Sequence, residues 1–366
     1  MENHLDLYSD YLIANLGQAS ATGCASVLDH AISHDAITRF LGQEIQDGKA
    51  LWVQVKSLVK QHQHDDGCLI FDDTIIEKPY MDESDLVAWH WDHCKNRSVK
   101  GIQLLSAFYV SPLRTDSLCP VRIPVTFSLI RKDVLVDDPK TEKQKRKSAL
   151  SKNELVRHMV AQMIANGLKF KYVLADSWYG SVENMTYIAK KDKYFIFDLK
   201  SNRQVQPGSE AQDKKDLSAS SWVRIDELDL PDNMPTRVWL KDLSFPVLVC
   251  KQRFINKDDS IGFRFLVSND ATLSGEEFAL IYQKRWGVEE YHKSLKQNVG
   301  IAKSPAHSIT TQSNHIFAAL IAYVKLEKLK FASNLNHFAL KTKIFLEISR
   351  AAFQKVRNFN LTMDLA

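Results

Sequence analysis

The order of secondary-structure elements between residues 68 and 199 constrains the fold of this chain more than any other feature. Three apolar, β-branched segments are typical of strands, and two amphipathic segments, each followed by a short apolar run, are typical of helix–strand pairs. The predicted order is β-β-β-α-β-α-β, which indicates an α/β fold with a mixed sheet flanked by helices. The predicted elements are 68–71, 101–110, 121–130, 152–168, 172–175, 182–191 and 194–199.

Acidic residues follow two of these strands. The first strand leads directly into Asp72-Asp73-Thr74, and the strand at 172–175 leads into Asp176. This order of elements, with carboxylates at the ends of the first and fourth strands, resembles the core of RNase H-like enzymes. We therefore expect an RNase H-like catalytic domain whose first part spans 66–200.

The flanking segments complete the expected architecture. Residues 201–269 contain short strand-like runs separated by turns, which predicts an antiparallel β insertion within the catalytic domain. The other expected parts are a helical N-terminal region at 1–65, the second part of the catalytic domain at 270–332, and a helical C-terminal region at 333–366. Within the N-terminal region we expect helices at 5–16, 25–40 and 43–61, with Asp35 as a helix cap.

Composition permits several functions and excludes few. A chain of 366 residues that is 45% hydrophobic and 25% charged is an ordinary globular protein, long enough for two or three domains. Its net charge of +4 permits a polyanionic partner without requiring one. The N-terminus lacks a basic, then apolar, leader, and no apolar run approaches the roughly 20 residues that span a bilayer. We expect a cytoplasmic protein without membrane contacts.

The cysteines do not indicate a structural metal or a disulfide framework. The chain has five cysteines and no CxxC pair. His90, His93 and Cys94 lie close together in the sequence, but a tetrahedral zinc site needs a fourth ligand. Because no second cluster supplies that ligand, we do not expect zinc there.

The segment from 280 to 299 has a helical period, and a capping box, Ser274-Gly275-Glu276-Glu277, precedes it. At 100° per residue, one face carries charged and aromatic side chains and the other is apolar. A polar face of this kind is also typical of a solvated helix, and Glu289 and Lys293 form an ordinary i,i+4 pair. The polar face consists of Tyr282, Arg285, Trp286, Glu289, Lys293 and Lys296, and the core face of Leu280, Ile281, Val288, Tyr291, Leu295 and Val299.

Three acidic residues from separated elements suit metal-dependent phosphoryl chemistry. Asp73, Asp176 and Glu289 offer the hard oxygen ligands that Mg²⁺ prefers. Two such ions about 3.5–4 Å apart activate a nucleophile and stabilise a leaving oxygen during in-line displacement. We therefore expect two Mg²⁺ ions, with Mn²⁺ able to substitute.

The spacing Tyr282-x2-Arg285-x3-Glu289-x6-Lys296 resembles the Tyr-Arg-Glu-Lys (YREK) signature of a large group of bacterial insertion-sequence transposases, a branch of the DDE transposases. Phe71-Asp72-Asp73-Thr74 resembles the first acidic motif of that group, and Leu174-Ala175-Asp176-Ser177-Trp178-Tyr179-Gly180 resembles the second. In this group a β-rich insertion interrupts the RNase H-like domain before the glutamate. The resemblance extends over about residues 66–332.

The resemblance implies roles for these residues. Asp73, Asp176 and Glu289 would be catalytic metal ligands, and Asp73 is preferred to Asp72 because the family's aspartate directly precedes threonine. Asp72 stays an alternative. The signature residues would hold a DNA phosphate beside a flipped base, since arginine can bind phosphate oxygens bidentately. These DNA-binding residues would be Tyr282, Arg285 and Lys296, together with Lys293, which matches a lysine frequent in the motif.

Three further features bear on DNA contacts. The insertion is expected to supply an aromatic ring that stacks on the flipped base, and Trp286 either packs or faces DNA. The charged run at 140–152 is typical of a solvated loop, but it is also a candidate for phosphate contacts. The N-terminal region shows no helix-turn-helix signature. The candidate stacking residues are Phe263, Trp222 and Trp239.

The resemblance implies a cut-and-paste transposase. It would bind the terminal inverted repeats of its element, hydrolyse the 3′ phosphodiester and join that 3′-OH to target DNA; many members resolve the flanking strand through a DNA hairpin. Cleavage in trans implies a homodimer on two paired ends, with contacts in the helices from His337. Two alternatives remain, an RNase H-like nuclease without strand transfer and a non-catalytic DNA-binding derivative.

Overall fold

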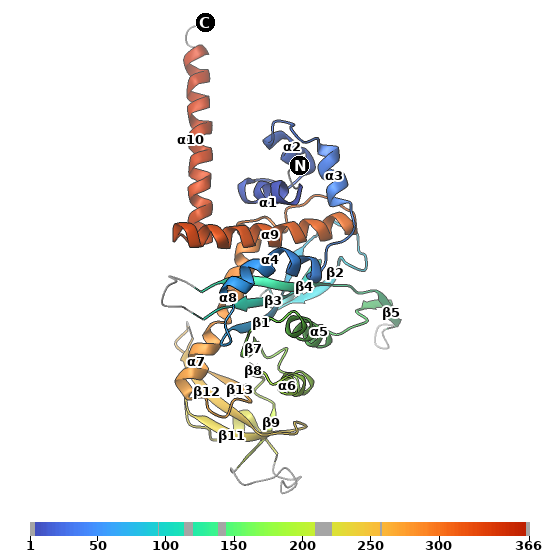
Figure 1. The fold of residues 1–366 in the computed structure, drawn as a ribbon. Helices are drawn as coiled ribbons and strands as arrows, with labels where there is room; N and C mark the ends of the chain where they lie inside the picture. Colours follow the sequence, from blue (N-terminus) through green and yellow to red (C-terminus); the bar gives the residue numbers. More distant parts are fainter. Residues whose placement is uncertain are drawn as a thin grey trace.

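The computed structural model describes residues 4–93, 95–112, 120–137, 144–208, 222–256 and 258–363. Over these ranges the strands form one 11-stranded mixed sheet and a separate hairpin, with helices packed on the sheet (Figure 1). The helices are α1 (His4–Ala14), α2 (Ala21–Val27), α3 (His34–Leu41), α4 (Gly48–His62), α5 (Lys152–Ala165), α6 (Val182–Ala189), α7 (Gly275–Gln283), α8 (Trp286–Gln297), α9 (Ile309–Ser333) and α10 (His337–Met363). The strands are β1 (Cys68–Glu77), β2 (Ala88–Asp92), β3 (Arg97–Val110), β4 (Arg122–Ile130), β5 (Val134–Asp137), β6 (Gln144–Lys147), β7 (Tyr172–Ala175), β8 (Tyr194–Leu199), β9 (Gln204–Pro207), β10 (Val223–Arg224), β11 (Pro235–Leu240), β12 (Val247–Ile255) and β13 (Ile261–Ser268).

The order of strands in the sheet is β10-β9-β11-β12-β13-β8-β7-β1-β3-β2, and β4 also pairs with β3. Strands β1, β7 and β8 run parallel to one another, and β3 is antiparallel to β1. The insertion strands are antiparallel, as predicted, and β13 pairs with β8, so they continue the main sheet. The predicted fold class, an RNase H-like mixed sheet flanked by helices, is confirmed.

Helices cover both faces of the sheet. Successive residues of a strand point to opposite faces. On β4, the Thr126 hydroxyl lies 3.1 Å from the Gln162 amide of α5, whereas the Phe127 ring packs against Phe317 of α9 at a centroid distance of 6.4 Å. Because β1 is antiparallel to β3, its residues are assigned to the α5 face or the α8–α9 face in the same way.

The N-terminal helices pack on α9 rather than standing apart. The Tyr8 hydroxyl lies 3.0 Å from Nδ1 of His315, and the Asn314 amide donates to the carbonyl oxygen of Leu41 at 3.0 Å. A single buried apolar cluster runs from Leu5 to Leu326. The domain boundaries that we expect from the sequence stay predictions.

The prediction of one helix at 25–40 is wrong. The structure has two short helices there, α2 and α3, because Asp29 and His30 adopt positive φ angles of 48° and 58°. The side chain of Ser33, not Asp35, caps α3 by accepting from the Ala36 N–H. The following helix, α4, starts at Gly48 instead of residue 43, since Asp47 caps it.

The prediction of one continuous helix through residues 280–299 is also wrong. Lys284 and Arg285 donate backbone hydrogen bonds to residues three positions earlier, which tightens the chain into a join between α7 and α8. Because of this join, the face of α7 that we expect to be polar is buried, and the face that we expect in the core is exposed. Tyr282 is buried, at 2% exposure, and Leu280 is 56% exposed.

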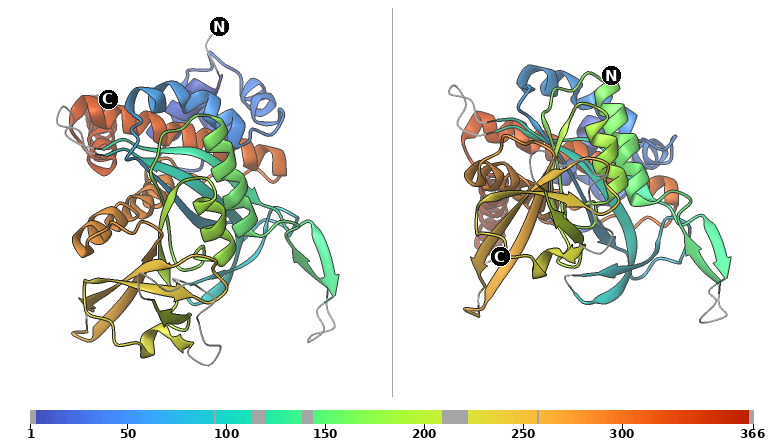
Figure 2. Two further views of the ribbon diagram at one scale, coloured as in Figure 1. Left: turned by 60° about the horizontal axis from the view of Figure 1, so that its bottom comes forward. Right: turned by 90° about the horizontal axis from the view of Figure 1, so that it is seen from below.

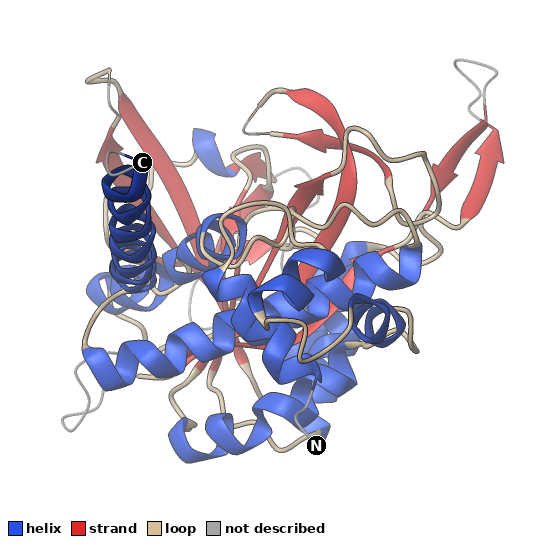
Figure 3. Cartoon of the chain, turned by 90° about the horizontal axis from the view of Figure 1, so that it is seen from above, coloured by secondary structure: helices blue, strands red, loops and turns tan. Residues whose placement is uncertain are grey.

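Two elements project from the body. The charged loop that we expect near 132–152 contains a hairpin, β5–β6, which extends sideways from the sheet (Figures 2 and 3). Residues 138–143 of that loop lie outside the described residues. Helix α10 extends away from α9 with most of its length free of the body (Figure 1). None of the helices in the described parts of the chain is long and apolar enough to cross a membrane.

Candidate active site

The acidic motifs meet where two parallel strands separate. Strand β7 pairs with β1 only over residues 68–70, so the rest of β1 extends past it with that edge open. Asp72 and Asp73 lie on this open part of β1, and Asp176 directly follows the last residue of β7. The expected strand at 68–71 is too short: Asp72 and Asp73 lie inside β1, which runs to Glu77, and only Asp176 follows a strand end. The three carboxylates are neighbours because β1 extends past the end of β7.

Asp73 faces α5. Its carboxylate lies 2.9 Å from Nζ of Lys152 and accepts hydrogen bonds from the Tyr179 hydroxyl and the Gln103 amide. Burial alone would raise the pKa of Asp73, but Lys152 and these hydrogen bonds outweigh it and lower the pKa. Lys152 is the first residue of α5, whose start is fixed by the Ser151 capping box.

Asp72 is on the opposite, α8–α9, face. Its register partner is Ser106, whose hydroxyl lies 3.2 Å from the Tyr291 hydroxyl of α8. Burial, Asp176 and Asp73 raise the pKa of Asp72 to about 7, although its Oδ1 accepts the Asp73 N–H at 2.8 Å. Of the two neighbouring aspartates, Asp73 is therefore the more fully ionised at neutral pH.

Asp176 completes a group of mutually repelling carboxylates. Its Oδ1 accepts the Trp178 N–H at 3.0 Å, which fixes the turn after β7. Burial raises its pKa, and the charge of Asp73 adds to the rise. A divalent cation between such carboxylates would relieve this repulsion, so the chemistry of these donors fits Mg²⁺.

Asp198, which sequence reasoning missed, lies beside this group. It is the penultimate residue of β8, the next parallel strand, and its carboxylate is 3.9 Å from Nε of Arg264. Burial raises the pKa of Asp198 to about 6; Arg264 opposes the rise and Asp176 adds to it. Its place at a third parallel strand end is the signal that could have identified it.

Glu289 lies in α8 and is held by a signature residue. Its carboxylate is 56% exposed and lies 2.8 Å from the guanidinium of Arg285, which is 12% exposed. Within the described ranges, no three His, Cys, Asp or Glu side chains lie close enough together to hold a metal ion. The structure thus brings Asp73 near Asp176 and leaves Glu289 paired with Arg285, and the predicted triad stays a prediction.

Comparison with known protein families identifies the family of the chain. The family model described as DDE superfamily endonuclease matches residues 1–221, more than half of the chain. The chain belongs to the DDE superfamily of endonucleases. A second model, described as transposase DDE domain, matches residues 150–325. No curated protein matches the chain.

The two matches overlap at the second acidic motif of this DDE endonuclease. The first covers Asp73 and Asp176, and the second covers Asp176 and Glu289. The protein is therefore a transposase or endonuclease of this superfamily, which acts on DNA and generally depends on divalent metal ions.

The predicted DNA-binding residues of this DDE endonuclease differ in accessibility. Tyr282 is buried, and its hydroxyl lies 3.5 Å from the Ala175 carbonyl oxygen, so it anchors α7 next to Asp176. Lys296 is exposed on α8, one turn beyond the buried His292. Lys293 is exposed on another side of α8, with Nζ 5.0 Å from the ring centre of Phe338 in α10.

Arg285 acts on the acidic group through its charge. Its charge opposes the raised pKa values of both Asp72 and Asp176. Its guanidinium also lies 5.6 Å from the ring centre of Tyr282. Trp286, at 55% exposure, is on the surface next to it.

The candidate stacking residues of the insertion separate clearly by burial. Trp239 is only 5% exposed and Trp222 is half-buried. Phe263 on β13 is 49% exposed, with Nζ of Lys251 at 4.7 Å from its ring centre. Phe263 is therefore the candidate with a free ring face.

The His90, His93 and Cys94 group, where we expect no zinc, lies only partly within the described residues. His90 is buried on β2, where burial and then Lys132 lower its pKa to about 4. Cys94 lies outside the described residues.

Proposed function

We propose that this DDE endonuclease is an insertion-sequence transposase that performs Mg²⁺-dependent cleavage and strand transfer. It binds the terminal inverted repeats of its element, cleaves at their 3′ ends and joins each 3′-OH to target DNA. The observation that supports this proposal is the overlap of the endonuclease and transposase family matches at Asp176, within the group of buried carboxylates.

In this proposal Asp73, Asp176 and Glu289 hold the metal. Asp73 already binds a cation, Nζ of Lys152, at 2.9 Å. Glu289 joins the aspartates once it leaves Arg285. Bound Mg²⁺ supplies a Lewis acid that polarises the phosphodiester and lowers the pKa of water or of a 3′-OH. The chain's own residues position the DNA strand.

Arg285 has a natural second partner in this scheme. A DNA phosphate group can replace the Glu289 carboxylate on its guanidinium, because each offers two oxygens that can accept from arginine. The exposed Lys296 and Lys293 extend positive charge along α8, and Tyr282 fixes the join on which Arg285 lies. The YREK signature therefore forms the DNA-holding side of the site.

The decisive test replaces Glu289 with Gln. We expect Glu289→Gln to retain binding of duplex DNA that carries the element ends and to lose Mg²⁺-dependent cleavage by at least about a thousandfold. The matched control is Glu290→Gln, because Glu290 pairs with Arg122 instead. Wild-type cleavage by Glu289→Gln would show that the triad is misassigned.

Strand-transfer assays with pre-cleaved ends separate the proposal from its alternatives. A transposase joins the 3′-OH to target DNA. Cut product without joined product indicates a nuclease of the same fold. DNA binding without cleavage in Mg²⁺ or Mn²⁺ indicates a non-catalytic derivative.

We also propose a homodimer that assembles through α10. Exposed apolar residues recur along this helix at the helical period, among them Ile348, Ala352 and Val356, with exposures of 37% for Ile348 and 58% for Val356. A second copy of α10 is the partner whose stripe matches in length and chemistry.

A further inference from the structure

A row of aromatic rings lies on the surface beside the acidic group. Trp91 is 53% exposed on β2, and Trp178 is 48% exposed two residues after Asp176. His93 lies between them, with ring centres 6.5 Å from Trp91 and 6.3 Å from Trp178. The three rings come from two segments far apart in the sequence, so the fold brings them together, with steep angles of 78° and 56° between neighbouring ring planes.

Lysines surround the end of this row that is nearest to the carboxylates. Nζ of Lys152 lies 4.8 Å from the centre of the Trp178 ring, and Nζ of Lys200 lies 5.4 Å from it. Lys152 also contacts Asp73. One lysine therefore separates the last ring of the row from the proposed metal ligand.

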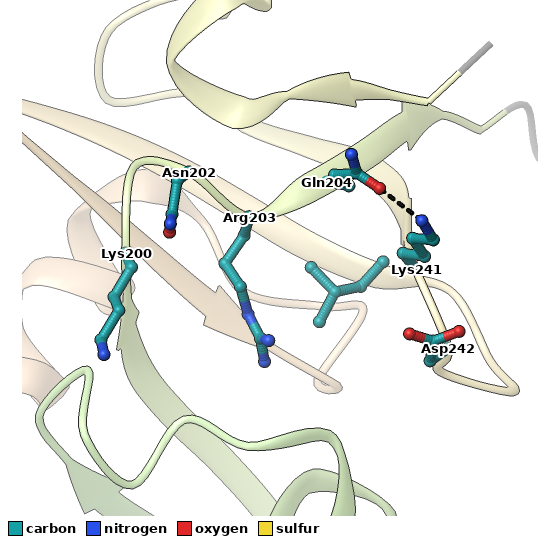
Figure 4. Close-up of a pocket in the computed structure, with 7 residues that line it drawn as sticks. Lys200, Asn202, Arg203, Gln204, Lys241 and Asp242 are labelled. Carbon is teal, nitrogen blue, oxygen red and sulfur yellow. Dashed lines mark hydrogen bonds between the residues drawn. The ribbon is translucent and has the colours of Figure 1, made fainter. Parts of the chain in front are cut away.

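Lys200 also lines a pocket at the ends of β8 and β11 (Figure 4). Arg203 and Lys241 contribute two more cations to its wall, and Asp242 contributes one anion. Lys241 donates to Gln204 at 2.7 Å, and Arg203 donates to the Gly180 carbonyl oxygen at 2.7 Å, so both side chains are fixed in place. The pocket is net positive and open to phosphate.

Packing does not account for the exposure of these rings. Trp239 shows what a tryptophan used for packing looks like in this chain, at 5% exposure. Trp91 and Trp178 instead leave about half of their surface to water, and two lysines, Lys152 and Lys200, lie over the Trp178 ring. Aromatic faces beside lysines are the combination that binds single-stranded nucleic acid.

We propose that Trp91, His93 and Trp178, with Lys200, Arg203 and Lys241, form a binding surface for an unpaired stretch of a DNA strand. Bases stack on the rings, and phosphates lie at the cations. Base-paired DNA keeps its bases stacked on each other and cannot use the rings. The inference rests on the proposed function and extends it. A strand held on this surface continues past Lys152, which contacts both Trp178 and Asp73, to the acidic group.

The rings are tested by equilibrium binding of a single-stranded oligonucleotide of about ten thymidines, with a duplex of equal length and an abasic strand for comparison. We expect Trp178→Ala and Trp91→Ala to weaken single-strand binding by about 5- to 100-fold each, the range that base–aromatic stacking gives. Trp178→Phe and Trp91→Phe keep a ring and are the matched controls, with losses of at most about threefold. Circular dichroism checks that each variant is folded.

The cations are tested by the salt dependence of the same binding. Each phosphate contact on a single strand contributes about −0.7 to the slope of log K against log salt. We expect Lys200→Ala and Lys241→Ala each to make the slope shallower by about that amount. Lys49→Ala, an exposed lysine of α4, is the control with an unchanged slope.

The outcomes distinguish this surface from the proposed function. Alanine variants that bind the single strand as wild type does, or phenylalanine variants as weak as alanine variants, overturn the surface even if the wild type cleaves element ends. Equal affinity of the wild type for the abasic strand and for oligothymidine also overturns it. A wild type that binds single strands through the rings but never cleaves leaves the surface standing and refutes the transposase.

Discussion

At the scale of single residues, Lys152 takes the position of a cation in the acidic group. Its ammonium contacts Asp73 at 2.9 Å, and both side chains are mostly buried, at 20% and 16% exposure. Without a metal, this contact keeps Asp73 ionised within a cluster of like charges. A metal ion that binds Asp73 must compete with it.

Removal of Lys152 is therefore expected to favour metal binding. We predict that Lys152→Met shifts the midpoint of the Mg²⁺-induced rise in melting temperature to about fivefold lower Mg²⁺, equivalent to about 1 kcal/mol for one partly buried charge. Thermal-shift titration measures this without any activity. Lys169→Met, which removes a surface pair with Asp65, is the control. An unchanged or higher midpoint for Lys152→Met would contradict the competition.

His315 gives a residue-scale prediction about acid. It is buried between Tyr8 and the Gly300 carbonyl oxygen, and burial, then Lys78, lower its pKa from 6.5 to about 4. The unfolded chain therefore takes up a proton below pH 6.5 that the folded chain excludes until pH 4. The contribution to stability is complete above pH 6.5 and is lost as the pH falls towards 4.

We predict that this one group removes about 2 kcal/mol of unfolding free energy between pH 7 and pH 5. His315→Gln should be less stable than the wild type at pH 7 and should lose correspondingly less on acidification, measured by urea unfolding at both pH values. The exposed His158 of α5 offers the control, His158→Gln. An equal loss in His315→Gln and the wild type would exclude His315 as the source.

The candidate site was predictable from sequence only where strand ends identify it. The pattern predicted both aspartates just after apolar strands; Asp176 does follow β7, whereas Asp73 lies within β1, beyond the residues that pair with β7. Lys152 was not predictable as their partner, because its position depends on how the start of α5 docks against β1. Glu289 is four residues from both Arg285 and Lys293, so spacing alone does not show which of them it pairs with; in the structure it pairs with Arg285.

At the scale of elements, the periodicity of hydrophobic residues predicted the strands and helices of the core but not the places where the chain turns. β1, β3, β4, α5, β7, α6 and β8 follow from β-branched runs and apolar stripes that tertiary packing reinforces, whereas β2 was not predicted. The join between α7 and α8 does not follow from the sequence. Its hydrogen bonds to residues three positions earlier are donated by Lys284, Arg285 and Val288 as well as by Gly287, and an isolated glycine does not identify such a join. The buried Tyr282 shows that docking against β7 decided that geometry.

The β5–β6 hairpin is regular structure where the sequence predicts a loop. Its sequence is dominated by charge, which indicates a solvated loop, and Val134 and Leu135 remain 41% and 54% exposed in the paired strands. Pairing there satisfies backbone hydrogen bonds without a core beneath, so hydrophobic pattern carries little information about it.

At the scale of the whole molecule, α10 sets the expected assembly. A 27-residue helix that leaves the body with an exposed apolar stripe cannot bury it within the part of the chain that the structure describes. Two copies would bury both stripes. The predicted dimer holds two active sites on one particle, as paired DNA ends require.

We predict that Ile348→Glu combined with Val356→Glu converts the dimer to a monomer, measured by analytical ultracentrifugation at micromolar concentration. Loss of two buried aliphatic contacts per chain costs about 3 kcal/mol or more, over a hundredfold in Kd. Gln354→Glu, on the other side of the helix, should leave the dimer intact. A wild type that sediments as a monomer would refute assembly through α10.

The packing of the first helices on α9 has a consequence for synthesis. Asp10 reaches Lys325 at 2.7 Å and Tyr8 reaches His315, so α1 leaves the ribosome more than 300 residues before the helix that it packs against. Contacts of such high sequence separation slow folding. Until α9 emerges, the apolar side of α1 stays uncovered on the nascent chain, and chaperones have a long interval in which to bind it.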